Sequence, residues 1–156
     1  SAALWLIWKT LKTDLTKRYL SKTPKNIFWL SLLGIPYLIW MYSIGIELNK
    51  KNTEYNKMNQ MLLNILVGYP TLYLISAWIL ILTKNMNMDT ILPFHFGAMF
   101  SIFLLMILTS RTIIKFEKRE RLKESNGIGL FFGIWYYFIG IWYIQPKMNE
   151  YIKRIV

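Results

Sequence analysis

Residues 127–144 read GIGLFFGIWYYFIGIWYI, an apolar stretch of 18 residues without a charged side chain. A run of this length and composition is typical of a helix that crosses a membrane. Gly129 and Gly133 are one helical turn apart and Gly140 follows two turns later, so the three lie near one helix face. Small residues at such spacing let another helix approach closely in lipid. We therefore expect a helix-packing face here, although glycine is also common in membrane helices without this role.

Three further apolar blocks occupy residues 27–46, 61–83 and 91–110. Of the 156 residues, 54% are hydrophobic and 17% are aromatic, and the apolar residues cluster in these blocks. Each block is long enough to cross a bilayer, which leaves no room for a sizeable water-soluble domain. The sequence therefore predicts an all-α fold in a single membrane domain over residues 1–156, a polytopic bundle of four transmembrane helices.

Residues 4–22, which precede the first block, have the pattern of an amphipathic helix. Apolar side chains recur there at intervals of three and four, while Thr16 and Lys17 face away from that stripe. We expect this helix to lie in the membrane interface; the alternative is an amphipathic helix packed on the protein's own loops. Aromatic and basic side chains suited to the interface are Trp5, Trp8, Lys9, Lys12, Lys17 and Arg18, and Trp142 and Tyr143 close the last block.

Two blocks contain a Gly–x–Pro pattern near their middle, Gly34 with Pro36 and Gly68 with Pro70. Proline removes a backbone hydrogen bond from a helix, so we expect a kink at each pair. Such kinks are static bends more often than hinges. An internal repeat with a site at the membrane midplane is an alternative, but the residues that flank the two patterns do not match.

A second pair of small residues, Gly97 and Ser101, lies four apart in the block at residues 91–110. This spacing makes it a plausible mate for the Gly129–Gly133 face. The helix is expected to run on through residues 111–124, where Glu117 and Arg121 have the spacing of a surface ion pair.

The formal net charge of +11 lies entirely outside the four blocks. In a membrane protein such a charge favours the anionic lipid surface as a partner, rather than nucleic acid. With four spans, however, ten Lys and Arg residues fall on one side of the membrane and nine on the other, so the positive-inside rule gives no orientation. Three explanations are open: one block does not fully cross, with residues 27–46 the best candidate; the chain inserts both ways; or partner subunits set the orientation, which we favour.

Chemistry-bearing residues are scarce in the apolar blocks, which contain no Asp, Glu, Lys or Arg. Catalytic and transport sites in membranes usually depend on such groups. His95 is the sole histidine and is expected to be packed or at the interface, with a pH-sensitive role as the alternative. The chain has no cysteine. We therefore expect no catalytic residue, no metal site and no cofactor.

The last third of the chain carries three recognisable stretches: HFGAMF at residues 95–100, GIW at 133–135 and IGIWYIQPKMN at 139–149. This part resembles a group of small uncharacterised bacterial membrane proteins, whose aromatic final span ends IGIWxIQPxxN. The resemblance implies a small polytopic membrane protein and assigns no functional residue. We favour the bacterial inner membrane as its location. Those proteins often have proline before the IG pair, where this chain has Phe138, so its final helix is expected to be straighter. The Asn-, Lys-, Ile- and Tyr-rich composition also fits an organellar inner membrane.

These observations together favour a non-enzymatic role. The expected function is that of an accessory or assembly subunit, held in a larger membrane complex or in a homo-oligomer. The alternative is a homo-oligomeric channel or a membrane-perturbing effector, with polar side chains facing a central pore.

Overall fold

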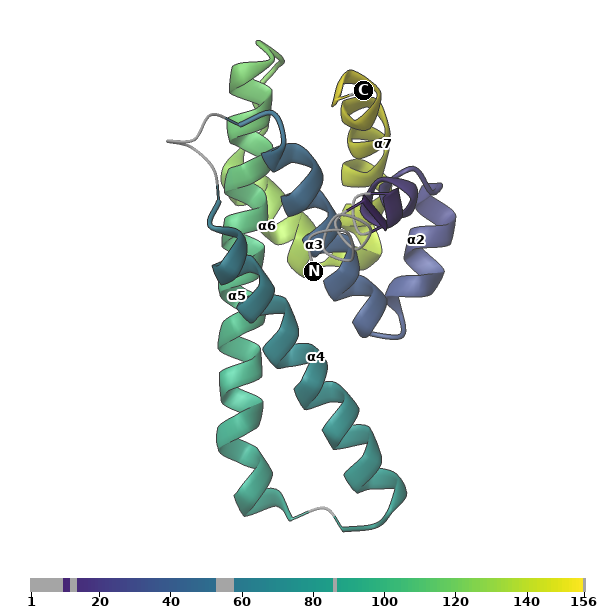
Figure 1. The fold of residues 1–156 in the computed structure, drawn as a ribbon, viewed down its shortest axis with the longest axis vertical. Helices are drawn as coiled ribbons and strands as arrows, with labels where there is room; N and C mark the ends of the chain where they lie inside the picture. Colours follow the sequence, from purple (N-terminus) through teal and green to yellow (C-terminus); the bar gives the residue numbers. More distant parts are fainter. Residues whose placement is uncertain (1–9, 12–13, 53–57, 86, 156) are drawn as a thin grey trace.

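The computed structural model describes residues 10–11, 14–52, 58–85 and 87–155. These residues are all-helical and contain no strand (Figure 1), as the sequence predicted. A helical segment over residues 14–20 is followed by six helices: α2 (Pro24–Ser31), α3 (Ile35–Asn49), α4 (Gln60–Leu82), α5 (Met88–Arg119), α6 (Gly127–Trp135) and α7 (Tyr137–Ile155).

The chain divides visibly into a long helical hairpin and a clustered part. The hairpin consists of α4 and α5, and its turn lies far from the other helices (Figure 1). We call residues 14–52 and 105–155 the head, because they contain most of the buried core. That core is apolar and continuous across α3, the C-terminal half of α5, α6 and α7, with Trp40, Phe116, Ile134, Ile141 and Ile144 all fully buried.

Only α4 and α5, within the described residues, are long and apolar enough to cross a membrane. At 1.5 Å per residue the 23 residues of α4 extend about 34 Å, against a hydrocarbon core of about 30 Å. The spans expected at residues 61–83 and 91–110 thus correspond to α4 and to the first two-thirds of α5. Four transmembrane helices are not confirmed, because each of the other two apolar blocks is divided between two helices.

The block at residues 27–46 breaks between α2 and α3. Gly34 has a φ of +78°, which is strained for any residue with a Cβ atom, and Pro36 lies in the first turn of α3. The kink expected at this pair is therefore a complete break of the helix. Pro70 has a different effect, since it lies inside α4 and that helix continues through it. The same Gly–x–Pro pattern gives two outcomes because only the first glycine adopts a positive φ.

The block at residues 127–144 breaks at Tyr136, so it does not form the single helix expected from its length. Tyr136 has φ −87° and ψ 58°, outside the helical region, and α7 returns along α6. The break deprives the Ile134 carbonyl of its usual partner within the helix, and the Tyr37 hydroxyl donates to it at 2.6 Å instead. A side chain of α3 thereby stabilises the end of α6.

Gly133 and Gly140 face each other across this break. A Cβ atom on Gly140 would lie 1.6 Å from the Gly133 carbonyl oxygen, so no side chain fits there. The two helix backbones are in direct contact at this point. The sharp return of α7 onto α6 therefore depends on glycine at position 140.

We expect Gly140→Ala to destabilise the protein more than Gly129→Ala. The added methyl group would force the α6 and α7 backbones apart, and overpacking of this kind costs about 1–3 kcal/mol or more. At Gly129 a Cβ atom would meet its nearest neighbour, Asn126 Cβ, at an ordinary 3.7 Å. Thermal unfolding of both purified variants in detergent, followed by tryptophan fluorescence, measures the difference; equal melting temperatures would refute the backbone contact.

Candidate functional site

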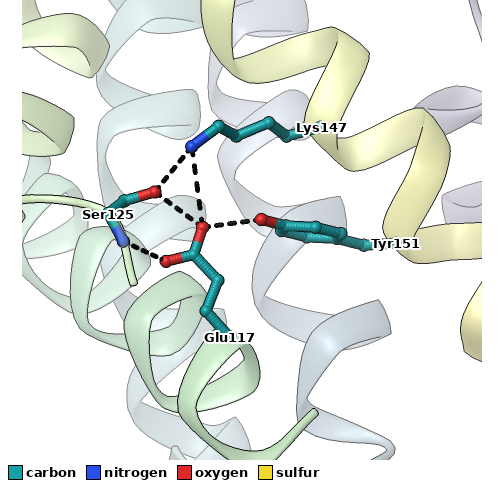
Figure 2. Close-up of polar contacts among 4 residues, drawn as sticks. All are labelled: Glu117, Ser125, Lys147 and Tyr151. Carbon is teal, nitrogen blue, oxygen red and sulfur yellow. Dashed lines mark hydrogen bonds and ion pairs between the residues drawn. The ribbon is translucent and has the colours of Figure 1, made fainter. Parts of the chain in front are cut away.

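A buried carboxylate lies at the head end of α5. Glu117 has no exposed surface, and three groups converge on its side chain (Figure 2). The Ser125 backbone N–H donates to Oε2, while the Ser125 and Tyr151 hydroxyls donate to Oε1, all at 2.6 Å. Lys147 Nζ lies 3.8 Å from Oε1 and donates to Ser125 Oγ at 2.7 Å. We call these four residues the Glu117 cluster.

The cluster is assembled from three separate parts of the chain. Glu117 is in the last turns of α5, Ser125 directly precedes the α6 cap Asn126, and Lys147 and Tyr151 are one turn apart on α7. The Asn126 side chain accepts from the Ile128 backbone N–H and so begins α6 directly after this contact. The Glu117 cluster thereby fixes the course of the chain between α5 and α6, and it holds α7 against both.

The arrangement is suited to structural support. A buried carboxylate is costly unless it is paired and hydrogen-bonded, and Glu117 has both an ion pair and three donors. The Ser125 hydroxyl donates to Glu117 and accepts from Lys147, so its oxygen is engaged on both sides. Lys147 also lies over the Tyr143 ring, 4.5 Å from its centroid. These bonds hold α5, the start of α6 and α7 together.

The pKa of Tyr151 is raised above the ordinary value of a tyrosine. Burial is the main cause that raises the pKa of its phenol, and the hydrogen bond to the negative Glu117 raises it further. The phenol therefore keeps its proton, and with it the bond to Glu117, above the pH at which an exposed tyrosine ionises.

Gln145 forms a second buried polar network, at the centre of the head. Its Oε1 accepts from the Trp40 indole N–H at 2.8 Å, and its Nε2 donates to the carbonyl oxygens of Leu20 and Lys22. One amide thus connects α7 to α3 and to the turn that follows residues 14–20. The buried Glu47 plays a similar part, since it accepts from the Thr16 hydroxyl and pairs with Lys50.

The small residues singled out in the sequence are brought together in other pairs than expected. Gly133 lies against Gly140, within the divided last block. Gly97 lies against the Tyr69 ring, and a Cβ atom there would come within 2.6 Å of the phenolic oxygen. The neighbour of Gly129 is Asn126, and Ser101 is half-buried on α5. The expected pairing of Gly97 and Ser101 with Gly129 and Gly133 is therefore not formed.

His95 lies on α5 in the hairpin, where its Nδ1 is 2.8 Å from the hydroxyl of Tyr73 on α4. The Tyr69 hydroxyl, one turn earlier on α4, donates to the Phe94 carbonyl of α5. Two tyrosines on one face of α4 therefore connect the two helices. His95 thus has a polar partner on the neighbouring helix. Gly68 lies in the same turn of α4, with open space where a Cβ atom would be.

The residues expected at the membrane interface fall into three groups. Trp142 and Tyr143 are exposed on α7, and Lys17 and Arg18 belong to the helical segment at residues 14–20. Trp5, Trp8, Lys9 and Lys12 lie outside the described residues. Thr16 differs from its expected place facing away from the apolar stripe, because it is buried and bonded to Glu47, whereas Leu15 of the stripe is exposed.

Sequence reasoning missed the Glu117 cluster and the Gln145 network. Glu117 was expected to form a surface pair with Arg121, but α5 ends at Arg119 and Arg121 has a φ of +53°, so Arg121 lies beyond the helix. The spacing of Lys147 and Tyr151 puts them on one face of a helix, which was a signal for a shared acceptor. Gln145 directly follows the last apolar block, and its polarity at that point was the corresponding signal.

No group of three or more His, Asp or Glu side chains in the described part of the chain could hold a metal ion. Comparison of the chain with protein families, curated proteins and solved structures found no match. The interpretation of the site therefore rests on its geometry.

We expect Glu117→Ala to destabilise the head by about 1–3 kcal/mol, because the Ser125 N–H and the Tyr151 hydroxyl would lose a buried acceptor. Glu124→Ala is the matched control, since Glu124 is exposed, seven residues further along the same segment. Thermal unfolding of both variants in the same detergent gives the comparison. If Glu117→Ala melted at the same temperature as the control, the Glu117 cluster would not stabilise the head as we expect.

We expect the stabilising contribution of Tyr151 to depend on pH in one direction. Its pKa is raised in the folded protein, so the contribution is fully present below the ordinary tyrosine value of 10.0 and is lost as pH rises toward the folded value. The stability difference between the wild type and Tyr151→Phe should stay constant up to about pH 10 and shrink above it. Unfolding at pH 8 to 11 tests this, with Tyr136→Phe as the control because Tyr136 is exposed. A stability difference between the wild type and Tyr151→Phe that grows with pH would contradict the prediction.

Proposed function

We propose that the chain is a non-enzymatic integral membrane protein that serves as an accessory or assembly subunit of a larger membrane complex or homo-oligomer. The observation that carries this proposal is the bare surface of the hairpin. Only 11% of the most apolar window of α4 and 17% of that of α5 are buried within the chain. Lipid or other helices must cover the rest, because an exposed apolar surface of this size is unfavourable in water.

One side of the hairpin has the character of a contact surface. Phe96, Phe100 and Phe103 recur at intervals of four and three on α5, and all three are exposed. Large aromatic side chains bring much contact area with little loss of conformational freedom. We call these three residues the Phe stripe and propose it as the site at which a neighbouring membrane helix packs.

The polar groups of the head support a non-enzymatic role. Glu117, Glu47 and Gln145 are buried, and their hydrogen bonds connect helices to one another. A reaction site needs polar groups that converge on an open space where a substrate can sit. Here the converging groups contact each other instead.

A homo-oligomeric channel is the second candidate, and one observation favours it. A groove of about 410 Å³ lies between α4 and α5 near the hairpin turn, and Tyr73, Ser76 and Thr90 are among its lining residues. His95 contacts Tyr73 beside it. Several copies that turned these polar side chains inward could line a pore.

We propose a multi-pass location in a bacterial inner membrane, which the resemblance of the last third favours; the composition leaves an organellar inner membrane as the alternative. The lipid partner is the anionic bilayer surface, to which a chain of net charge +11 is attracted. No nucleic-acid partner is proposed.

Native mass spectrometry after extraction in a mild detergent tests the assembly. We expect the 18.7 kDa chain to be held with unlike subunits or in defined copies. Unlike subunits would argue against a simple channel, and symmetric copies alone would favour it. A chain recovered only as a monomer would contradict both.

Phe100→Leu should weaken the assembly if the Phe stripe is the contact surface, because the ring is lost while the side chain stays apolar. Phe132→Leu is the matched control, as Phe132 is a similarly exposed phenylalanine on α6 of the head. The fraction of chain in the assembled species is measured in both variants. Equal loss in the two would place the contact elsewhere.

A further inference from the structure

Two connections between helices in the head, the α2–α3 turn and the α6–α7 turn, expose apolar side chains. The α2–α3 turn carries Leu33, which is 71% exposed, and the α6–α7 turn is followed by Ile139, which is 78% exposed. Aromatic side chains flank both turns, with Trp29 before the first and Trp135, Tyr136 and Phe138 around the second. We call these two turns the apolar tips. Apolar and aromatic surface of this kind needs a cover that is not water.

The helices that lead to the apolar tips are too short to cross a bilayer. α2 has 8 residues and α6 has 9, which correspond to about 12 and 14 Å of helix. A hydrocarbon core of about 30 Å requires roughly 20 residues. Each pair therefore reaches less than halfway across before the chain turns.

Both helix pairs return to the side from which they started. On the second pair, Gly133 meets Gly140 next to the turn, and Ser125 meets Lys147 at the far ends. α6 and α7 are therefore antiparallel. On the first pair, α2 and α3 contact each other and are joined by a turn (Figure 1). Gln145 bonds to the Lys22 carbonyl before α2 and to the Trp40 indole in α3, so the start of α2 lies near α3. The polar ends of both pairs lie together, away from the apolar tips.

This fold separates the basic residues sharply. The described part of the chain has 16 Lys and Arg residues, of which 15 belong to the head. The other is Lys84, in the turn between α4 and α5, and the acidic Asp89 lies at the same end of the hairpin in the first turn of α5. If only α4 and α5 cross, the head lies on one side of the membrane and this turn on the other. The charge distribution then has the strong bias that the positive-inside rule requires, which four spans do not give.

We propose that the apolar tips are a membrane-docking surface that enters one leaflet from the side of the basic head, and that only α4 and α5 cross the bilayer. The occupant of this surface is the lipid of the anionic cytoplasmic leaflet. Apolar side chains at the tips enter the acyl region, while Lys and Arg of the head remain at the headgroups, as in interfacial helices. The inference rests on a membrane location but is independent of whether the chain assembles with partners.

Single-cysteine labelling tests this topology, because the chain has no cysteine of its own. A cysteine is placed at Gln60, Asn85, Glu124 or Lys153, all of which are exposed. A membrane-impermeant maleimide is then applied to intact cells and to inverted membrane vesicles. We expect Gln60→Cys, Glu124→Cys and Lys153→Cys to react only in inverted vesicles, and Asn85→Cys only in intact cells.

The two topologies differ in the side on which Lys153 lies relative to the other three positions. With four spans, Glu124→Cys and Lys153→Cys would react from opposite sides, and that result would overturn the inference while leaving assembly untouched. If all four positions reacted from one side, the hairpin would not cross, and the membrane part of the proposed function would fail as well. Assembly itself is read separately from the native mass.

The depth of the apolar tips is tested with cysteines at Leu33 and Ile139. Both should resist the impermeant reagent from either side and become reactive when the membrane is dissolved in detergent. Exposed Ser21→Cys, just before α2, is the control that stays reactive in inverted vesicles. Reaction at Leu33 and Ile139 from the aqueous side in membranes would overturn lipid as the occupant and indicate tips that lie in water or under a removable protein.

Discussion

The return of α7 onto α6 is the constraint on which the head depends. It is possible because two backbones touch at Gly133 and Gly140, and even one methyl group would not fit at Gly140. A continuous helix over residues 127–155 would carry Gln145, Lys147 and Tyr151 away from α3 and α5. The fold-back instead places them beside Trp40 and Glu117. A single close approach of two glycines therefore determines which polar groups can meet.

The polar bonds then make the fold-back specific. An apolar core alone would tolerate sliding of α7 along its neighbours, since Ile141 and Ile144 pack without directional contacts. Gln145 and Glu117 are 28 residues apart in the chain, with α6 between them, and each has hydrogen-bond partners in a fixed geometry. Their hydrogen bonds select one register, because a shift by one residue would leave a buried carboxylate and a buried amide without partners. Register in the head is thus set by polar contacts and stability by the apolar core.

Hydropathy predicted the hairpin well and the head poorly, for a physical reason. Residues 61–83 and 91–110 correspond closely to α4 and to the apolar part of α5. The blocks at 27–46 and 127–144 have the same length and composition, but a window average cannot distinguish one crossing helix from two short ones that turn back. The distinction lies in the backbone at Gly34 and Tyr136, and it depends on tertiary contacts such as the Tyr37 hydroxyl with the Ile134 carbonyl. The candidate site was missed for the same reason, since Tyr151 and Lys147 reach Glu117 only after α7 has returned.

The even distribution of charge over four expected spans is a conflict that the proposed two-span topology would remove. Ten cations against nine is an arrangement that membrane insertion does not favour, because short basic loops are retained on the cytoplasmic side. If the α2–α3 and α6–α7 turns do not cross the membrane, the conflict with the positive-inside rule is removed without any partner subunit. The basic residues before and after each turn then lie on the same side of the membrane. The two turns also need no charge of their own, and none is found between residues 27 and 46 or between 127 and 144. An apolar block of full spanning length is therefore compatible with a pair of short helices, and the placement of Lys and Arg around it is the better guide to which of the two a chain adopts.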